Sequence, residues 1–134
     1  MTNEPLISQF RQIVGTNHVL TGQKATERFR KGFRSGEGSA LCVVRPGTLL
    51  EYWNVLQACV DADKIIIMQA AKTGLTEGST PKETYGRDVV LVNSMRIDGL
   101  QTLQEGRQVL SFAQAPRASP SINFSGRRNA RPIP

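Results

Sequence analysis

Three short apolar runs constrain the fold of this chain more than any other feature of its sequence. They span residues 40–44, 65–68 and 89–92. None of them alternates apolar with polar residues, which is typical of strands that are covered on both faces. A longer segment of helical periodicity separates the first run from the second. This order of strand, helix and strand predicts a small parallel β-sheet with crossover connections.

The helix between the first two runs has a recognisable start. Thr48 and Glu51 have the spacing of a capping box, in which side chains accept hydrogen bonds from free backbone amides, and the helix is expected to end near Asp63. Four large apolar residues fall on one stripe of this helix: Leu49, Trp53, Leu56 and Val60. We expect this stripe, tryptophan included, to pack on the sheet. Glu51, Asn54 and Gln57 are then expected to face water.

Shorter elements flank this unit. Apolar residues recur at helical spacing over residues 5–14, with Pro5 in the first turn and Gly15 as a stop, and residues 23–29 form a shorter helical stretch. A weaker pattern predicts one further strand over residues 108–112. A chain of 134 residues has room for one folding unit. The predicted fold class is therefore α+β, a small parallel sheet with flanking helices.

The net charge of +6 is unevenly distributed. Residues 1–110 hold 13 Lys and Arg against 11 Asp and Glu, whereas residues 111–134 hold four Arg and no acid. A small basic protein that binds phosphate or nucleic acid remains an alternative function, because clustered arginines attract phosphate backbones. The tail contains no recognised nucleic-acid-binding module, so nucleic acid is not an expected partner. A second basic cluster, Arg30, Lys31 and Arg34, is interpreted as a solvated face.

Several classes of site and location are disfavoured. His18 is the single histidine, so neither a metal cluster nor a Ser-His-Asp triad is expected. Cys42 and Cys59 lie in apolar stretches and are interpreted as buried free thiols, which fits a reducing, cytoplasmic compartment. No apolar run is long enough for a transmembrane segment, and the first ten residues lack the features of a secretory leader.

The loop that follows the isoleucine-rich run carries the chemistry. Gly74 and Gly78 allow close approach of a ligand and positive φ angles, and successive amides in such a turn form a concave nest for phosphate oxygens. Thr73 and Ser79 add hydroxyl donors, and Lys72 adds a positive charge. The loop is not a P-loop, because its lysine precedes the glycines. By composition alone, an ordinary surface connection remains the alternative.

Four segments in the same order resemble the start of quinone-dependent (respiratory) D-lactate dehydrogenases: residues 30–36, 44–51, 58–66 and 68–81. The resemblance covers about residues 6–110, and Gly-Leu-Thr-Glu-Gly-Ser-Thr-Pro, from Gly74, is its most specific part. It implies a flavoprotein of the vanillyl-alcohol-oxidase type. On this resemblance, residues 1–110 form the N-terminal part of an FAD-binding domain, namely its first subdomain, with the domain incomplete.

The resemblance also implies a cofactor and a reaction. Main-chain donors of seven residues are expected to surround the FAD diphosphate: Ala70, Ala71, Lys72, Thr73, Gly74, Gly78 and Ser79. Because the loop holds no histidine or cysteine, the FAD is expected to be non-covalent. In the family, D-lactate is oxidised to pyruvate and electrons pass through FAD to quinone. Members are peripheral on the cytoplasmic face of the bacterial inner membrane, and their catalytic residues lie farther along than this chain reaches.

Two departures from the family accompany the resemblance. Lys72 stands where the family commonly has a small polar residue. Residues 111–134 have the unpatterned look of a shifted reading frame and are expected to be a disordered tail. The truncated chain is therefore expected to have negligible D-lactate dehydrogenase activity alone.

Overall fold

A four-stranded sheet forms the centre of the molecule in this computed structural model, which describes residues 2–97, 100–103 and 108–111. The strands are β1 (Val19–Thr21), β2 (Cys42–Val44), β3 (Ile65–Gln69) and β4 (Val89–Asn93), and their order in the sheet is β1-β2-β4-β3. β4 runs parallel to both β2 and β3, and β1 is antiparallel to β2. The predicted small parallel sheet is confirmed.

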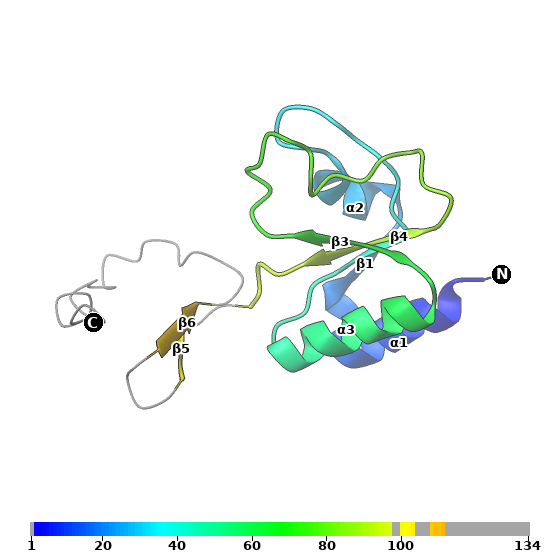
Figure 1. The fold of residues 1–134 in the computed structure, drawn as a ribbon. Helices are drawn as coiled ribbons and strands as arrows, with labels where there is room; N and C mark the ends of the chain where they lie inside the picture. The colour runs from blue at the N-terminus through cyan, green and yellow to red at the C-terminus, as the bar shows by residue number, and fades with distance from the viewer. Residues whose placement is uncertain (1, 98–99, 104–107, 112–134) are drawn as a thin grey trace.

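Helices cover both faces of this sheet. Figure 1 shows α1 (Glu4–Val14) and α3 (Leu49–Asp61) on one face and α2 (Gln23–Arg30) on the other. A short 3-10 helix, η1 (Thr16–His18), leads from α1 into β1. α1 begins with a proline in its first turn and stops at Gly15, whose φ of 86° is unfavourable for other residues, as the sequence predicts.

The apolar core has two parts, one on each face of the sheet. On the face covered by α1 and α3, Phe10 of α1 packs in one cluster with Val90 and Val92 of β4. On the other face, Phe29 of α2 packs in a second cluster with Leu91 of β4. β4 thus alternates between the two parts and is buried on both faces. The free thiols of Cys42 and Cys59 are fully buried in the first part, which confirms their assignment as core residues.

β3 differs from the expectation that residues 65–68 are covered on both faces. Met68 is 61% exposed, and Ile65 and Ile66 are only partly buried. The reason is the strand order, because β4 inserts between β2 and β3 and leaves β3 at the edge of the sheet. An apolar run alone does not distinguish a central strand from an edge strand.

α3 begins as predicted but buries a different face. The hydroxyl of Thr48 accepts a hydrogen bond from the Glu51 amide (3.1 Å), and the Glu51 carboxylate accepts one from the Gly47 amide (2.6 Å). The predicted core stripe is wrong, since three of its members are 43–62% exposed: Leu49, Trp53 and Val60. The buried residues are instead Val55, Ala58 and Cys59. These smaller side chains allow α3 to approach the sheet closely beside α1.

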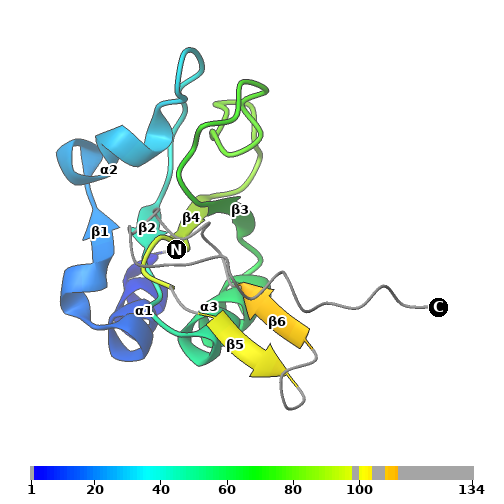
Figure 2. The same ribbon diagram turned by 90° about the vertical axis from the view of Figure 1, so that its left-hand side faces the viewer.

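A hairpin follows the central sheet. β5 (Leu100–Leu103) pairs antiparallel with β6 (Gln108–Ser111) in a separate two-stranded sheet, which Figure 1 shows set apart from the central sheet and which also appears in Figure 2. Of the strand predicted over residues 108–112, residues 108–111 form β6, and residue 112 lies outside the described residues. The partner strand β5 has no clear pattern in the sequence. Residues 112–134, on which the predictions of a disordered and frameshifted tail fall, lie outside the described residues.

Candidate functional site

The carboxyl ends of the three parallel strands meet at one edge of the sheet, where open α/β sheets place their ligands. The loop over residues 70–88 leaves β3 at this carboxyl edge, and all seven predicted cofactor-binding residues lie in its first part. Figures 1 and 2 show this loop beside the one that connects α2 to β2, on the α2 side of the sheet. We call residues 70–79 the ligand loop and residues 31–38 the wall loop.

The backbone amides of the ligand loop are largely unused. The Thr80 amide donates to the Glu77 carbonyl at 3.0 Å, and within the described chain no amide from 71 to 79 donates to a protein acceptor. The segment forms neither a helix nor a strand. Free donors on an irregular turn are the groups from which anion-binding nests are built.

The two glycines of the ligand loop face open space. A Cβ atom added at Gly74 would meet no heavy atom within 4 Å, and one added at Gly78 would meet only the Thr76 hydroxyl at 3.8 Å. Neither glycine has the positive φ expected for it. Positive φ angles occur instead at Lys72 (55°) and Glu77 (58°). The two glycines therefore leave room beside the backbone without making the turn.

Lys72 and Glu77, the two non-glycine residues with positive φ, both form side-chain hydrogen bonds to neighbouring segments. Lys72 Nζ donates to the carbonyls of Lys31 (2.7 Å) and Arg28, at the carboxyl end of α2. This end of a helix is its negative pole, so the ammonium is stabilised there. Burial, and secondarily the Arg28 charge, lowers the pKa of Lys72. Its charge is thus directed at α2, whereas its backbone remains in the ligand loop.

Gln69 anchors the start of the ligand loop, and sequence reasoning missed it. Its Nε2 donates to the carbonyls of Phe29 (2.7 Å) and Ser79 (2.6 Å), and its own carbonyl accepts from the Ser94 amide (2.8 Å). Its Oε1 is buried without a partner among the described residues. The only sequence signal is a polar residue that ends an apolar run. The side chain of Gln69 thus joins the end of β3 to α2 and to the end of the ligand loop, and its main-chain carbonyl joins it to the residue after β4.

The wall loop supports the ligand loop from one side. Ser35 Oγ donates to the Glu77 carboxylate at 2.6 Å, and Lys82 pairs with the same carboxylate. The bonds from Lys82 and then Ser35 lower the pKa of Glu77. Arg30, predicted to face water, is instead 7% exposed, because its guanidinium donates to the Gly38 carbonyl at 3.0 Å and thereby fixes the end of the wall loop.

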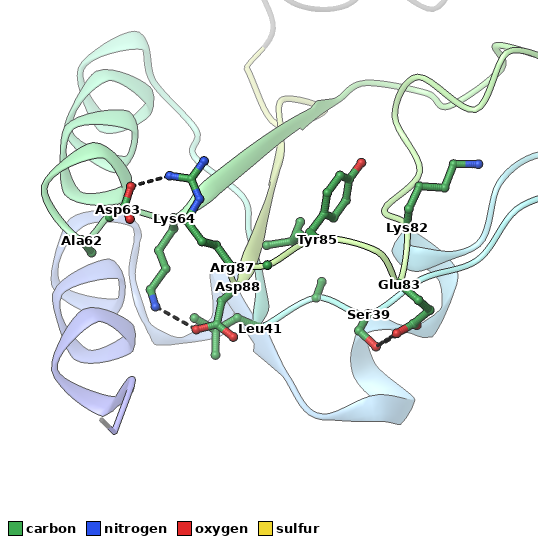
Figure 3. A pocket seen from close by; sticks show the side chains of 13 residues that line it. Ser39, Leu41, Ala62, Asp63, Lys64, Lys82, Glu83, Tyr85, Arg87 and Asp88 are labelled. Carbon is green, nitrogen blue, oxygen red and sulfur yellow. Dashed lines mark hydrogen bonds and ion pairs between the residues drawn. The ribbon is translucent and has the colours of Figure 1, made fainter.

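A hollow in the surface lies elsewhere. A pocket of about 610 Å³ opens at the amino ends of β2, β3 and β4, and none of the predicted site residues lines it. Figure 3 shows two ion pairs at this pocket, Lys64 with Asp88 (2.8 Å) and Arg87 with Asp63. Hydrogen bonds from Lys64 and Asn3 lower the pKa of Asp88. Because most of its charged side chains are already in ion pairs, this pocket is a weaker candidate than the ligand loop.

The residues that the structure describes offer no candidate metal centre. No three His, Cys, Asp or Glu side chains gather there in a way that suits a metal ion. None of the helices described has the length and apolar character that a membrane span requires.

Three relatives can be aligned with most of this chain. It is 56% identical over 111 residues to the quinone-dependent D-lactate dehydrogenase of Escherichia coli (strain K12), 50% over 111 residues to that of Haemophilus influenzae and 45% over 116 residues to that of Corynebacterium glutamicum. These matches cover 82–86% of this chain but only 19–20% of the relatives. No family model matches the chain.

Solved structures share its fold at low sequence identity. An alkyldihydroxyacetonephosphate synthase superposes with a TM-score of 0.65 at 12% identity, over 77% of this chain and 21% of that one. p-Cresol methylhydroxylase gives 0.52 at 15% identity, over 74% and 19% of the two chains. The predicted fold, a small parallel sheet with flanking helices, is confirmed. The chain is therefore homologous to the quinone-dependent D-lactate dehydrogenases over one segment, which spans about a fifth of their length.

Proposed function

We propose that the ligand loop holds the diphosphate of FAD and that residues 1–110 are the N-terminal part of an FAD-binding domain. Main-chain donors of seven residues surround the diphosphate: Ala70, Ala71, Lys72, Thr73, Gly74, Gly78 and Ser79. One observation carries this proposal. The amides from 71 to 79 donate to no acceptor within the described chain, and both glycines among them border open space. A doubly charged linker fits such a set of donors.

The names of the relatives, quinone-dependent D-lactate dehydrogenases, support the reaction that we propose for the whole enzyme. The whole enzyme oxidises D-lactate to pyruvate and passes the electrons to quinone, at the cytoplasmic face of the bacterial inner membrane. Bound FAD supplies the acceptor for the hydride equivalent that leaves the α-carbon of D-lactate. This segment contributes binding and orientation of the cofactor. No catalytic residue is assigned within it.

FAD binding is proposed to be non-covalent. The ligand loop contains no nucleophilic histidine or cysteine. Cys42 and Cys59 lie in the core, where burial raises the pKa of each thiol to about 12, so that neither is available as a thiolate. After acid precipitation of the FAD complex, flavin absorbance is expected in the supernatant. Flavin that stays with the protein pellet would contradict this part of the proposal.

A flavin titration with matched glycine variants tests the proposal. Purified chain is expected to change FAD fluorescence in a saturable manner. Gly74→Val places a branched side chain where the diphosphate would lie, so we expect at least a tenfold loss of affinity. Gly86→Val is the control, because a Cβ at Gly86 also meets nothing within 4 Å but lies at the pocket on the other edge.

Two outcomes would contradict the proposal. One is the absence of any saturable flavin signal with a chain whose circular dichroism shows that it is folded. The other is an equal loss of affinity in Gly74→Val and Gly86→Val. Thermal melts of both variants accompany the titration, so that a loss of binding is not mistaken for a loss of folding.

A further inference from the structure

Cationic side chains gather at the carboxyl edge of the sheet, next to the ligand loop. Arg45 follows β2 and Arg96 follows β4, and these strands are neighbours with Val44 beside Val92. Arg96 Nη1 donates to the Arg45 carbonyl at 2.5 Å, and the guanidinium of Arg96 lies over Gly47, where a Cβ would come within 2.9 Å of Nη2. Because these two arginines are far apart in the sequence, their proximity could not be predicted from it.

No described carboxylate neutralises this pair. Each ion pair within the described chain uses another cation: Arg11, Arg30, Lys31, Lys64, Lys82 or Arg87. Glu51 is a nearby acid, but its carboxylate accepts the Gly47 amide at 2.6 Å and forms no ion pair with either arginine. The Arg96 guanidinium thus lies against the backbone of Arg45, its charge helps to lower the pKa of the Arg45 side chain, and neither arginine has a counter-ion in this part of the protein.

Hydrogen-bonding nitrogens at this place are also unused. Arg45 Nε and His18 Nδ1 are both shielded from solvent and lack a partner among the described residues. A buried polar group without a partner is costly, and it often marks the position of an unseen ligand or ion. Burial, Arg28 and Arg96 lower the pKa of Arg45, and burial, Arg96 and Arg45 lower that of His18, which favours neutral imidazole.

We propose that Arg45 and Arg96 form a binding site for a phosphate group, separate from the main-chain donors of the ligand loop. A guanidinium presents a planar fork of donors that matches phosphate oxygens, and a dianion compensates more than one of these charges. α3 begins at Leu49, four residues after Arg45, so the positive pole of this helix adds to the same field. The site does not depend on flavin binding by the ligand loop.

Titration with inorganic phosphate tests this site on the full 134-residue chain. The arginine Nε–Hε resonances are followed by NMR against sodium acetate at matched ionic strength. We expect saturable shifts at Arg45 and Arg96 with phosphate, with a Kd on the order of 1 mM, and no saturation with acetate. Arg45→Gln and Arg96→Gln are expected to weaken phosphate binding at least tenfold. Arg45→Lys, which keeps the charge but loses the fork, is expected to weaken it severalfold.

Two control variants distinguish this site from the ligand loop and from the overall positive charge of the chain. Arg87→Gln removes the same charge at the opposite edge of the sheet and is expected to change phosphate affinity less than twofold. Gly74→Val, which tests the ligand loop, is expected to leave phosphate binding intact, so failure of the flavin proposal and failure of this one are visible separately. Phosphate shifts that do not saturate, saturation with acetate alone, or full affinity in a folded Arg45→Gln variant would overturn the proposal.

Discussion

The wall loop and the ligand loop are both rich in glycine, but their glycines face different surroundings. An added Cβ in the wall loop would lie far too close to protein atoms at each glycine: 1.9 Å from Ser35 O at Gly32, 2.7 Å from Glu77 Cδ at Gly36 and 2.4 Å from Pro81 O at Gly38. In the ligand loop, an added Cβ at Gly74 would meet nothing within 4 Å. The first set of glycines permits packing, whereas the second leaves space.

This difference separates structural from ligand-binding glycines. The wall loop lies directly against the segment that ends the ligand loop, and the Ser35 to Glu77 hydrogen bond joins them. A close fit on one side allows an irregular loop to keep its amides free on the other, because the fold does not depend on hydrogen bonds from those amides. Pre-organised donors of this kind lose little entropy when a ligand binds.

The largest expected effect comes from filling a wall-loop glycine. In Gly38→Ala, the new methyl group would overlap the Pro81 carbonyl, so the backbone of one loop must move. We expect the free energy of unfolding to fall by about 3 kcal/mol, at the upper end for overpacking. Urea denaturation followed by circular dichroism measures this change. Gly86→Ala is the matched control and is expected to change it by less than about 0.5 kcal/mol.

A smaller effect is expected from removing the anchor of the ligand loop. Gln69→Leu keeps a side chain of similar size but leaves the Phe29 and Ser79 carbonyls without their donor. The expected loss of stability is about 2 kcal/mol, because buried acceptors are left unpaired. Gln57→Leu, on the exposed face of α3, serves as the control in the same denaturation assay. An equal stability of the two variants would show that Gln69 does not hold the loop.

The fold was predictable from sequence where local interactions decide it. The start of α3 depends on Thr48 and Glu51, which are three residues apart, and was predicted correctly. The buried face of α3 was not, because it depends on how closely the helix must approach the sheet beside α1. Trp53 accordingly lies on the exposed side. The edge position of β3 depends on strand order, which apolar composition does not encode.

The candidate site shows the same limit. Its location after β3 follows from sequence, since a glycine-bearing loop at the carboxyl end of an apolar run is a local pattern. The direction of the Lys72 side chain is set by carbonyls at the end of α2, about forty positions away. Arg45 and Arg96 meet only because β2 and β4 are neighbours. A local sequence motif therefore does not predict contacts between segments that are distant in the sequence.

The smallest expected change in stability is the most informative about the ligand loop. Gly74 has no positive φ and nothing near its missing side chain, so Gly74→Ala introduces neither strain nor overlap. Alanine also restricts the unfolded chain, so we expect the free energy of unfolding to rise by about 0.5 kcal/mol, opposite in sign to Gly38→Ala. Both variants are measured in one urea series. If Gly74→Ala instead destabilises as strongly as Gly38→Ala, protein atoms fill the space beside Gly74, and no room remains there for a diphosphate.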